Sequence, residues 1–134
     1  MSAYKKITCS FKNKNILVEC LKNIDYAPVI YEEKHNLYGY RNDVREETAE
    51  IIVPKNQISK ASNDLGFTYD EEKDEYHMIC SDYDLSRGIG DKVKQSYAIT
   101  ALKSALKKHK FNISSEIKNK IVTINANKII WAKK

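Results

Sequence analysis

The stretch LGFTYDEEKDEYHMICSDYD, residues 65–84, predicts a β-hairpin and with it a sheet as the basis of the fold. Apolar side chains recur at every second position on both sides of an acidic turn at residues 70–74, the period-two pattern of half-buried strands. The alternating apolar residues are Leu65, Phe67, Tyr69, Tyr76, Met78 and Cys80. Pairing of these side chains across the two strands would stabilise the hairpin.

The segments before this hairpin predict three more strands and one helix. Alternation or β-branched residues indicate strands at residues 4–11, 27–33 and 48–54. Apolar residues at helical spacing predict a helix over residues 13–24, with Asn13 as its N-cap. Residues 37–47 are expected to form a turn or an irregular link, and residues 55–63 a loop or a single helical turn.

A long amphipathic helix is expected at residues 92–110, after a loop at residues 81–90. Its expected core face comprises Val93, Tyr97, Ala98, Ala101, Leu102, Ala105, Leu106 and His109. Four lysines cluster within about 60° on the opposite side. These are Lys92, Lys103, Lys107 and Lys110. Two or three short strands are expected among residues 112–117, 120–125 and 128–131, with turns at 118–119 and 126–127.

This order of elements predicts an α+β fold in which an antiparallel sheet carries both helices on one face, in the manner of a ferredoxin-like sandwich. The chain of 134 residues suits one domain, residues 1–134. It has only four glycines and two prolines, and no Pro- or Gly-rich linker marks a boundary.

The sequence predicts a soluble protein that is neither membrane-spanning nor secreted. No stretch approaches the roughly 20 apolar residues of a membrane span, and the first residues, MSAYKKITCSFKNK, lack the apolar core of a signal peptide. Cys9, Cys20 and Cys80 are far apart and odd in number, which indicates reduced, buried thiols. The expected compartment is the cytoplasm or a plastid stroma.

Charge is distributed unevenly along a chain whose formal net charge is +5. Residues 36–91 hold six basic and thirteen acidic side chains, whereas residues 92–134 hold eleven and one. Only three of the 23 basic residues are arginine, the residue best suited to reading guanine edges and gripping phosphates. The composition therefore argues against base-specific recognition, while the basic last third could still attract an anionic partner.

Several short motifs together resemble a known family. They are YGYR at 38–41 with TAEIIVP after it, the hairpin stretch at 65–84, and VKQSYAITALKSALKKHKF at 93–111. The chain resembles the hypothetical chloroplast reading-frame family thirty-five of cyanobacteria and algal plastids, with some members in phages. The matching residues are Gly39, Tyr40, Arg41, Gly66, Phe67, Gln95, Tyr97, Ala98 and Phe111. Lys110 departs from the glycine usual in the family. The resemblance implies a fold and a compartment but no activity.

The sequence offers no constellation that predicts catalysis, a metal or a cofactor. His35, His77 and His109 lie in separate elements without metal-ligand spacing. We expect His77 to face outward from its strand and His109 to close the long helix. The acidic residues of the hairpin are expected to be solvated. The stretch SRGIGDK, residues 86–92, has glycines that could let an anion approach a helix N-terminus, but it lacks the P-loop pattern.

The leading hypothesis is a non-catalytic binding or accessory protein for a protein partner or a small anionic ligand. The candidate binding residues are Tyr38, Tyr40, Arg41 and Arg45, because aromatic rings beside guanidinium groups are enriched at binding hot spots. The alternative is that the tyrosines pack on the sheet while Arg41 pairs with an acid such as Glu46.

The second hypothesis is sequence-indifferent binding of RNA or single-stranded DNA through Lys92, Lys103, Lys107 and Lys110. The alternative for these lysines is an ordinary solvated face. An enzyme is the third hypothesis, and the oligomeric state stays open.

Overall fold

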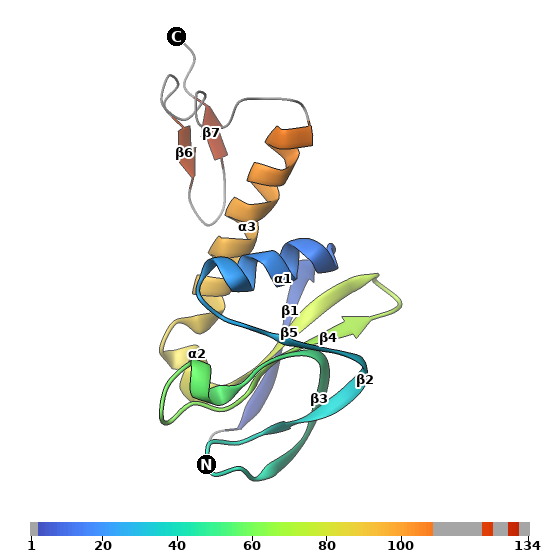
Figure 1. Ribbon diagram of the computed structural model, residues 1–134, viewed down its shortest axis with the longest axis vertical. Coiled ribbons are helices and arrows are strands. Elements are labelled where there is room, and N and C mark those ends of the chain that lie inside the picture. The colour runs from blue at the N-terminus through green and yellow to red at the C-terminus, as the bar shows by residue number, and fades with distance from the viewer. Residues whose placement is uncertain (1–2, 109–121, 125–128, 132–134) are drawn as a thin grey trace.

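The computed structural model describes residues 3–108, 122–124 and 129–131 and confirms the α+β fold (Figure 1). The elements of the main body are β1 (Tyr4–Phe11), α1 (Lys14–Asn23), β2 (Val29–Tyr38), β3 (Val44–Val53), a 3₁₀ turn (Lys55–Gln57), β4 (Leu65–Asp70), β5 (Glu75–Ser81), α2 (Asp82–Ser86) and α3 (Ile89–Lys108). Two further strands, β6 (Val122–Ile124) and β7 (Ile129–Trp131), form a separate antiparallel pair.

The main sheet is antiparallel throughout, with strand order β1-β5-β4-β3-β2. Strands β2 to β5 follow one another as a meander, and β1 joins it beside β5, so β1 and β2 are the two edges. The predicted hairpin is confirmed: Phe67 of β4 lies opposite Met78 of β5, and Asp70 opposite Glu75 beside the turn.

One face of the sheet forms the main core together with α1 and α3, as Figure 1 shows. Phe67 is fully buried on this face. Its ring contacts Phe11 edge-on with 6.0 Å between centroids, and Phe11 in turn lies 4.8 Å from the ring of Tyr97 on α3. Edge-to-face aromatic contacts add to the large apolar area that such rings bury. This cluster therefore joins the sheet to the long helix.

The start of α1 is fixed by two polar contacts. The side chain of Asn13 accepts a hydrogen bond from the backbone N–H of Ile16 at 3.0 Å, which confirms the predicted N-cap. The backbone N–H of Asn13 donates to the hydroxyl of Tyr97 at 3.1 Å. The same Tyr97 thus packs on the core and ties α3 to the β1–α1 turn.

The structure confirms the long helix but corrects its expected core face. The buried residues of α3 are Ile89, Gly90, Val93, Ser96, Thr100 and Leu106. Of the other expected core residues, Ala98, Ala101 and Leu102 are only half-buried and Ala105 is exposed.

Two hydroxyl groups explain this rotation of α3. The hydroxyl of Ser96 donates to the carbonyl of Cys20 in α1 at 2.8 Å, and Thr100 accepts from the side-chain amide of Asn23 at 3.1 Å. A hydroxyl that finds a partner loses most of the penalty for burial. Polar residues therefore occupy the α1 interface where the sequence predicted alanine and leucine.

Two connections also differ from the sequence prediction. Residues 81–90, expected as a loop, contain the short helix α2, whose N-cap is Ser81. Residues 37–47, expected as an irregular link, largely extend β2 and β3, and only residues 39–43 form the turn. Within this turn Asn42 has φ of 64°, and the Gly39 N–H donates to the Asp43 carbonyl at 2.8 Å.

A smaller cluster occupies the other face of the sheet, where β2 and β3 curl over it. The cluster contains Leu37, Ala49, Ile52 and Ile79. Gly66 permits this approach, because a Cβ on it would lie only 2.8 Å from the Cβ of Ala49. The hydroxyl of Tyr4, on edge strand β1, donates to the Asp64 carbonyl at 2.7 Å and lies 3.4 Å from the carbonyl of Tyr38, the last residue of the opposite edge strand. The two edges of the sheet therefore meet.

Part of the predicted C-terminal organisation falls within the described residues. β6 and β7 confirm the strands expected at residues 120–125 and 128–131. The strand expected at 112–117, both turns, His109 and Lys110 lie outside the described residues.

We expect Phe67→Ala to lower the free energy of unfolding by about 3–5 kcal/mol, because it removes the ring at the centre of the main core and leaves a cavity. Denaturant unfolding measures this value. Val44→Ala is the control: Val44 is 63% exposed, and we expect a change within about 0.5 kcal/mol. Equal losses in the two variants would contradict a core centred on Phe67.

Candidate functional site

The structure brings the four predicted binding residues to one end of the β2–β3 hairpin but separates their side chains. Tyr38 and Tyr40 are 43% and 37% exposed. Arg41 is exposed, with its guanidinium 5.2 Å from the centroid of the Tyr40 ring. Arg45 instead turns inward, 5.0 Å from the ring of Tyr4, and forms an ion pair with Asp43 at 3.5 Å. Arg45 is therefore part of the second-face packing.

The alternative for these residues placed Arg41 in an ion pair with an acid such as Glu46. Among the described residues, the ion pair at this turn joins Arg45 to Asp43 instead. The exposed ring and guanidinium of Tyr40 and Arg41 remain on the surface as a stacked pair.

Large exposed hydrophobic side chains concentrate on this same hairpin. Among the described residues they are Val29, Ile30, Tyr38, Tyr40 and Val44. Single exposed apolar residues are ordinary, but their gathering on one hairpin is typical of an interaction site. We call these five residues together with Arg41 the hairpin surface. The sequence analysis missed Val29, Ile30 and Val44, although Val29 and Ile30 stand in a segment that it did predict as a strand.

Buried side chains from the β3–β4 loop fix the backbone beneath the hairpin surface. The Asp64 carboxylate accepts from the backbone N–H of Tyr38 at 2.9 Å and from that of Lys55 at 2.9 Å. The Asn63 side-chain carbonyl accepts from the N–H of Tyr40 at 3.0 Å, and the Asp64 N–H donates to the Tyr38 carbonyl at 3.0 Å. Asn63 is 1% exposed and Asp64 7%. The two exposed tyrosines thus project from a firmly held backbone.

The loop is anchored in turn to the start of α2. The Asp84 carboxylate accepts from the N–H of Asn63 at 3.1 Å and from the Ser81 hydroxyl at 2.9 Å, and the Asn63 amide donates to Ser81 Oγ at 3.0 Å. Tyr4 closes the network through its bond to the Asp64 carbonyl. Burial, followed by the nearby Asp64 carboxylate, raises the pKa of Tyr4, so its hydroxyl stays a donor at neutral pH.

A hollow of about 310 Å³ opens next to the hairpin surface. Its lining consists of Val29, Tyr31, His35, Asn36, Tyr38, Ile52, Pro54 and Asp64. The rings of Tyr31 and His35 lie 3.8 Å apart, a contact made possible by an irregularity in the β2–β3 pairing between Ile30 and His35. A hollow lined by aromatic and aliphatic groups with a few polar ones suits an apolar side chain of a partner.

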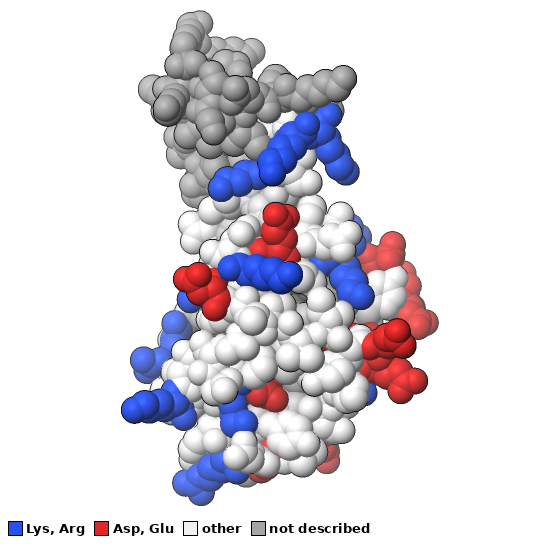
Figure 2. Space-filling view, in the orientation of Figure 1, with Lys and Arg blue, Asp and Glu red and all other residues white. Residues whose placement is uncertain are grey.

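Of the four lysines of the second hypothesis, Lys92, Lys103 and Lys107 are exposed on α3, and Lys110 lies outside the described residues. Lys92 lies beside Tyr26, with its ammonium 5.0 Å from the ring centroid and 3.5 Å from the hydroxyl. Lys92 and Lys103 border an open hollow between the end of α1 and α3, and Lys107 is exposed farther along α3. Figure 2 shows basic side chains over the end of α3 and acidic ones near the β4–β5 turn.

His77 is buried, and the prediction that it faces outward is wrong. The pairing of β1 with β5 is irregular between Ile7 and Phe11, and there the N–H of Cys9 donates to His77 Nδ1 at 3.0 Å. His77 Nε2 therefore carries the proton and lies 3.2 Å from Asp70 Oδ2 and 3.3 Å from Glu75 Oε2. Each ring nitrogen thus has a polar partner, and His77 occupies the place where the pairing of β1 with β5 is irregular.

The cysteine thiols are also buried within the fold. All three cysteines are free and buried, as predicted, and burial raises the pKa of Cys20 and of Cys80 to about 12. A thiol with so high a pKa is a poor nucleophile at neutral pH. Within residues 3–108 and the two short C-terminal strands, no group of three His, Cys, Asp or Glu side chains is placed to hold a metal ion.

We expect Asp70→Asn to remove a pH-dependent part of the stability. Partial burial acts to raise the Asp70 pKa, but hydrogen bonds from the Lys73 N–H, the His77 ring and the Glu72 N–H outweigh it, and the pKa lies below its ordinary value. The ionised form therefore stabilises the fold above the unfolded pKa of about 3.9, and this contribution is lost as pH falls through the lower folded pKa.

Urea unfolding of wild type and Asp70→Asn from pH 7 down to pH 3 checks this prediction. The gap between their unfolding free energies should stay constant down to about pH 5 and then shrink. Glu71→Gln, a change at an exposed position in the same turn, is the control. A gap that widens on acidification would contradict the stabilising role of the Asp70 carboxylate.

The fold and site define the chain as a small α+β domain with an exposed, rigidly supported hairpin surface. It belongs to a family described as protein of unknown function (DUF1257), whose model matches residues 20–125. This match covers β2 to α3 and so includes the hairpin surface. No curated protein matches the chain, and neither does any solved structure.

The helices that the structure describes differ from membrane-spanning helices. Within the part of the chain that the structure describes, none is both long enough and apolar enough to cross a bilayer.

Proposed function

We propose that the protein is a non-catalytic binding module and that a partner protein docks on its hairpin surface. One observation carries the proposal: within residues 3–108, the large exposed hydrophobic residues all lie on β2, the β2–β3 turn and the first residue of β3. Hot spots at protein interfaces combine such aromatic residues with arginine. Tyr40 and Arg41, stacked at the turn, supply this combination.

The support beneath the hairpin surface favours binding. Asn63 and Asp64 hold the backbone of Tyr38 and Tyr40 before any partner arrives. A surface that is already ordered loses less conformational entropy on association, so more of the contact energy appears as affinity. Tyr38 also lines the adjacent hollow, which offers a place for one apolar side chain of the partner.

Charge narrows the kind of partner. Residues 29–50 contain six acidic and three basic side chains, so this part of the surface has a negative balance. Complementary charge speeds association and selects partners. The proposed partner is therefore a protein segment that carries an apolar anchor among basic residues.

The contact is expected to use side chains more than an added strand. The edge of β2 carries Glu32, Glu33 and Lys34, and its pairing with β3 is irregular in this stretch. Charged residues and bulges on an edge strand discourage further strand pairing. The exposed apolar side chains at the two ends of the strand, Val29 and Ile30 at its start and Tyr38 at its end, remain available for contact.

We expect Tyr38→Ala and Arg41→Ala each to abolish capture of the partner without unfolding the domain. Truncation at an interface hot spot costs about 2 kcal/mol or more, roughly a thirtyfold loss of affinity. Tagged wild type and variants would be compared by affinity purification from the native host, followed by binding measurements with the protein recovered. Melting temperatures would be recorded in parallel.

Arg87→Ala is the matched control, because Arg87 is also exposed and also lies over a tyrosine, 5.4 Å from the ring of Tyr83, but at the C-cap of α2. It should capture the partner as well as wild type does. An early melting of Arg41→Ala would show that Arg41 is structural. Equal loss in Arg41→Ala and Arg87→Ala would overturn docking at the hairpin surface.

A second candidate function is sequence-indifferent binding of RNA or single-stranded DNA. Its support is the exposed Lys103, Lys107 and Lys108 at the end of α3, where Figure 2 shows basic side chains gathered without acidic ones among them. Lys92 lies apart from these three, near the start of α3 and beside Tyr26. Lys110, the fourth residue of this hypothesis, lies outside the described residues.

Four phosphate contacts would give a slope of about −3 to −4 in a plot of log affinity against log salt. We expect Lys103→Gln combined with Lys107→Gln to reduce this slope by about 2, since each change removes one contact. Electrophoretic mobility shifts with a single-stranded oligonucleotide measure it. A slope near zero, or no shift at low salt, would eliminate nucleic acid as the partner.

The proposal also covers the identity of the family and the cellular compartment of the protein. We infer that the family of unknown function is the one whose plastid and cyanobacterial members the motifs resemble, because Gly39, Tyr40 and Gly66 fall within the matched residues. The proposed location is a reducing compartment, cytoplasm or plastid stroma. Its support is that Cys9, Cys20 and Cys80 are all free thiols.

A further inference from the structure

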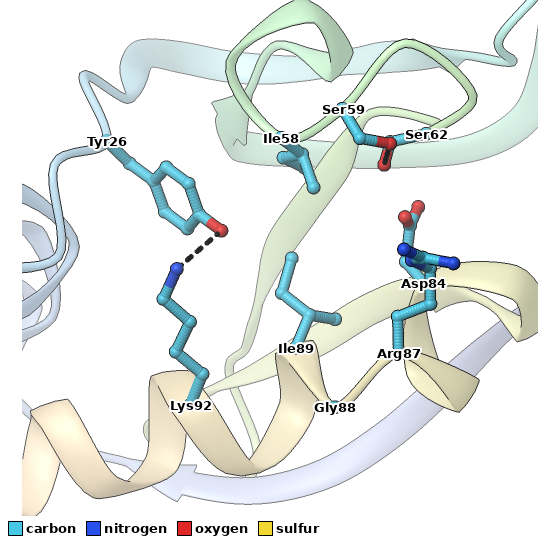
Figure 3. A pocket seen from close by; sticks show the side chains of 9 residues that line it. All are labelled: Tyr26, Ile58, Ser59, Ser62, Asp84, Arg87, Gly88, Ile89 and Lys92. Atoms are coloured by element: carbon cyan, nitrogen blue, oxygen red, sulfur yellow. Dashed lines mark hydrogen bonds between the residues drawn. The ribbon is translucent and has the colours of Figure 1, made fainter.

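A second concave site lies between the β3–β4 loop and the start of α3, shown in Figure 3. It encloses about 220 Å³. Its lining consists of Tyr26, Ile58, Ser59, Ser62, Asp84, Arg87, Gly88, Ile89 and Lys92. Figure 3 shows Ile58 and Ile89 facing each other in the middle, with Lys92 and Tyr26 at one end and the serines, Asp84 and Arg87 at the other.

Aromatic rings orient both cations of this pocket. The ammonium of Lys92 lies 5.0 Å from the ring centroid of Tyr26 and 3.5 Å from its hydroxyl. The guanidinium of Arg87 lies 5.4 Å from the ring centroid of Tyr83. Cation–π contacts restrict a long side chain while leaving most of its N–H donors unused. The pocket therefore holds two positioned cations with donors to spare.

Hydroxyl groups line the wall opposite Lys92. Ser59 Oγ and Ser62 Oγ lie 2.6 Å apart, so one donates to the other and the second hydroxyl proton remains for a further acceptor. Ser62 is 1% exposed, and its position is therefore fixed by packing. Donors thus face the pocket from the β3–β4 loop as well as from α3.

Asp84, the acidic residue in the pocket wall, does not cancel the positive charge of Lys92 and Arg87. Asp84 is 3% exposed, and its Oδ2 already accepts from the Asn63 N–H at 3.1 Å and the Ser81 hydroxyl at 2.9 Å. Hydrogen-bond donors spread the charge of a carboxylate and satisfy its lone pairs. The two cations Lys92 and Arg87 outnumber it, so the pocket as a whole attracts an anion.

We propose that this pocket binds a small phosphate-bearing molecule. The phosphate oxygens would accept from Lys92, from Arg87 and from the serine hydroxyl, and the remainder would rest against Ile58 and Ile89. The volume is below the range of drug-sized pockets, which limits the ligand to a few atoms beyond the phosphate. Residues 86–92, whose glycines suggested an anion site, supply Arg87, Gly88 and Lys92, but the binding groups are side chains and no P-loop is needed.

This site is separate from the hairpin surface, and the proposal does not rest on partner docking. The two share the β3–β4 loop, where Ser62 lines the pocket while Asn63 and Asp64 hold the hairpin backbone. Arg41→Ala should leave phosphate binding unchanged, and Lys92→Gln should leave partner capture unchanged. Failure of one proposal is therefore distinguishable from failure of the other.

The test is a titration of the full chain, labelled for amide NMR, with inorganic phosphate and with pyrophosphate at constant ionic strength. Saturable shifts are expected for the amides of residues 58–62 and 84–92. We expect Lys92→Gln, and independently Arg87→Gln, to weaken pyrophosphate binding about tenfold, the loss of one charge-assisted hydrogen bond. Both residues are exposed, so neither change should lower the melting temperature.

Lys94→Gln is the matched control, an exposed lysine on the same helix that does not line the pocket. It removes the same charge and should weaken binding less than about twofold, since only long-range attraction is lost. Equal weakening by Lys94→Gln and Lys92→Gln would overturn the site in favour of general attraction to a basic surface. Shifts that do not saturate, or none near residues 58–62, would also overturn it.

Discussion

The surfaces that we propose for binding depend on two buried polar residues, Asn63 and Asp64, in the loop between β3 and β4. Their side chains accept hydrogen bonds from the backbone of Tyr40, Tyr38 and Lys55, and the Asn63 N–H reaches Asp84 at the start of α2. A buried polar group is costly unless it is paired, so each of these bonds constrains the segments on both sides. The hairpin surface lies on one side of this loop, and the pocket for which we propose phosphate binding lies on the other.

The two faces of the sheet are built in different ways. The main core is a dense apolar layer in which Phe67, Phe11 and Tyr97 link the strands to α3. The second face is closed by curvature, because β2 and β3 fold over it where Gly66 leaves room for Ala49. Tyr4 then joins the two edges of the sheet. This curvature brings the end of β2 next to the β3–β4 loop, where Asp64 holds the backbone of the hairpin surface.

Local patterns predicted most of the helices and strands. The predictions were wrong where a polar side chain forms a hydrogen bond with a residue far away in the sequence. The hairpin at residues 65–84, the strand at 4–11 and the helix with its Asn13 cap follow from neighbours in the sequence. Ser96 and Thr100 are buried although neither belongs to the core face that the sequence predicted for this helix, and a hydroxyl is costly to bury without a partner. Their partners, the carbonyl of Cys20 and the amide of Asn23, come from a helix about 76 residues earlier. The prediction that His77 faces outward was wrong for the same reason, because its hydrogen-bond partner is the Cys9 N–H in another strand.

By itself, the sequence determined that this chain forms an antiparallel sheet covered by amphipathic helices, because side-chain periodicity is a property of neighbouring residues. It also pointed to Tyr38, Tyr40 and Arg41. Only the tertiary structure decided that Arg45 turns inward, that Val29 and Val44 stay exposed, and that Ser62, Arg87 and Lys92 share a pocket. Exposure and proximity depend on how distant segments pack, which no local pattern encodes.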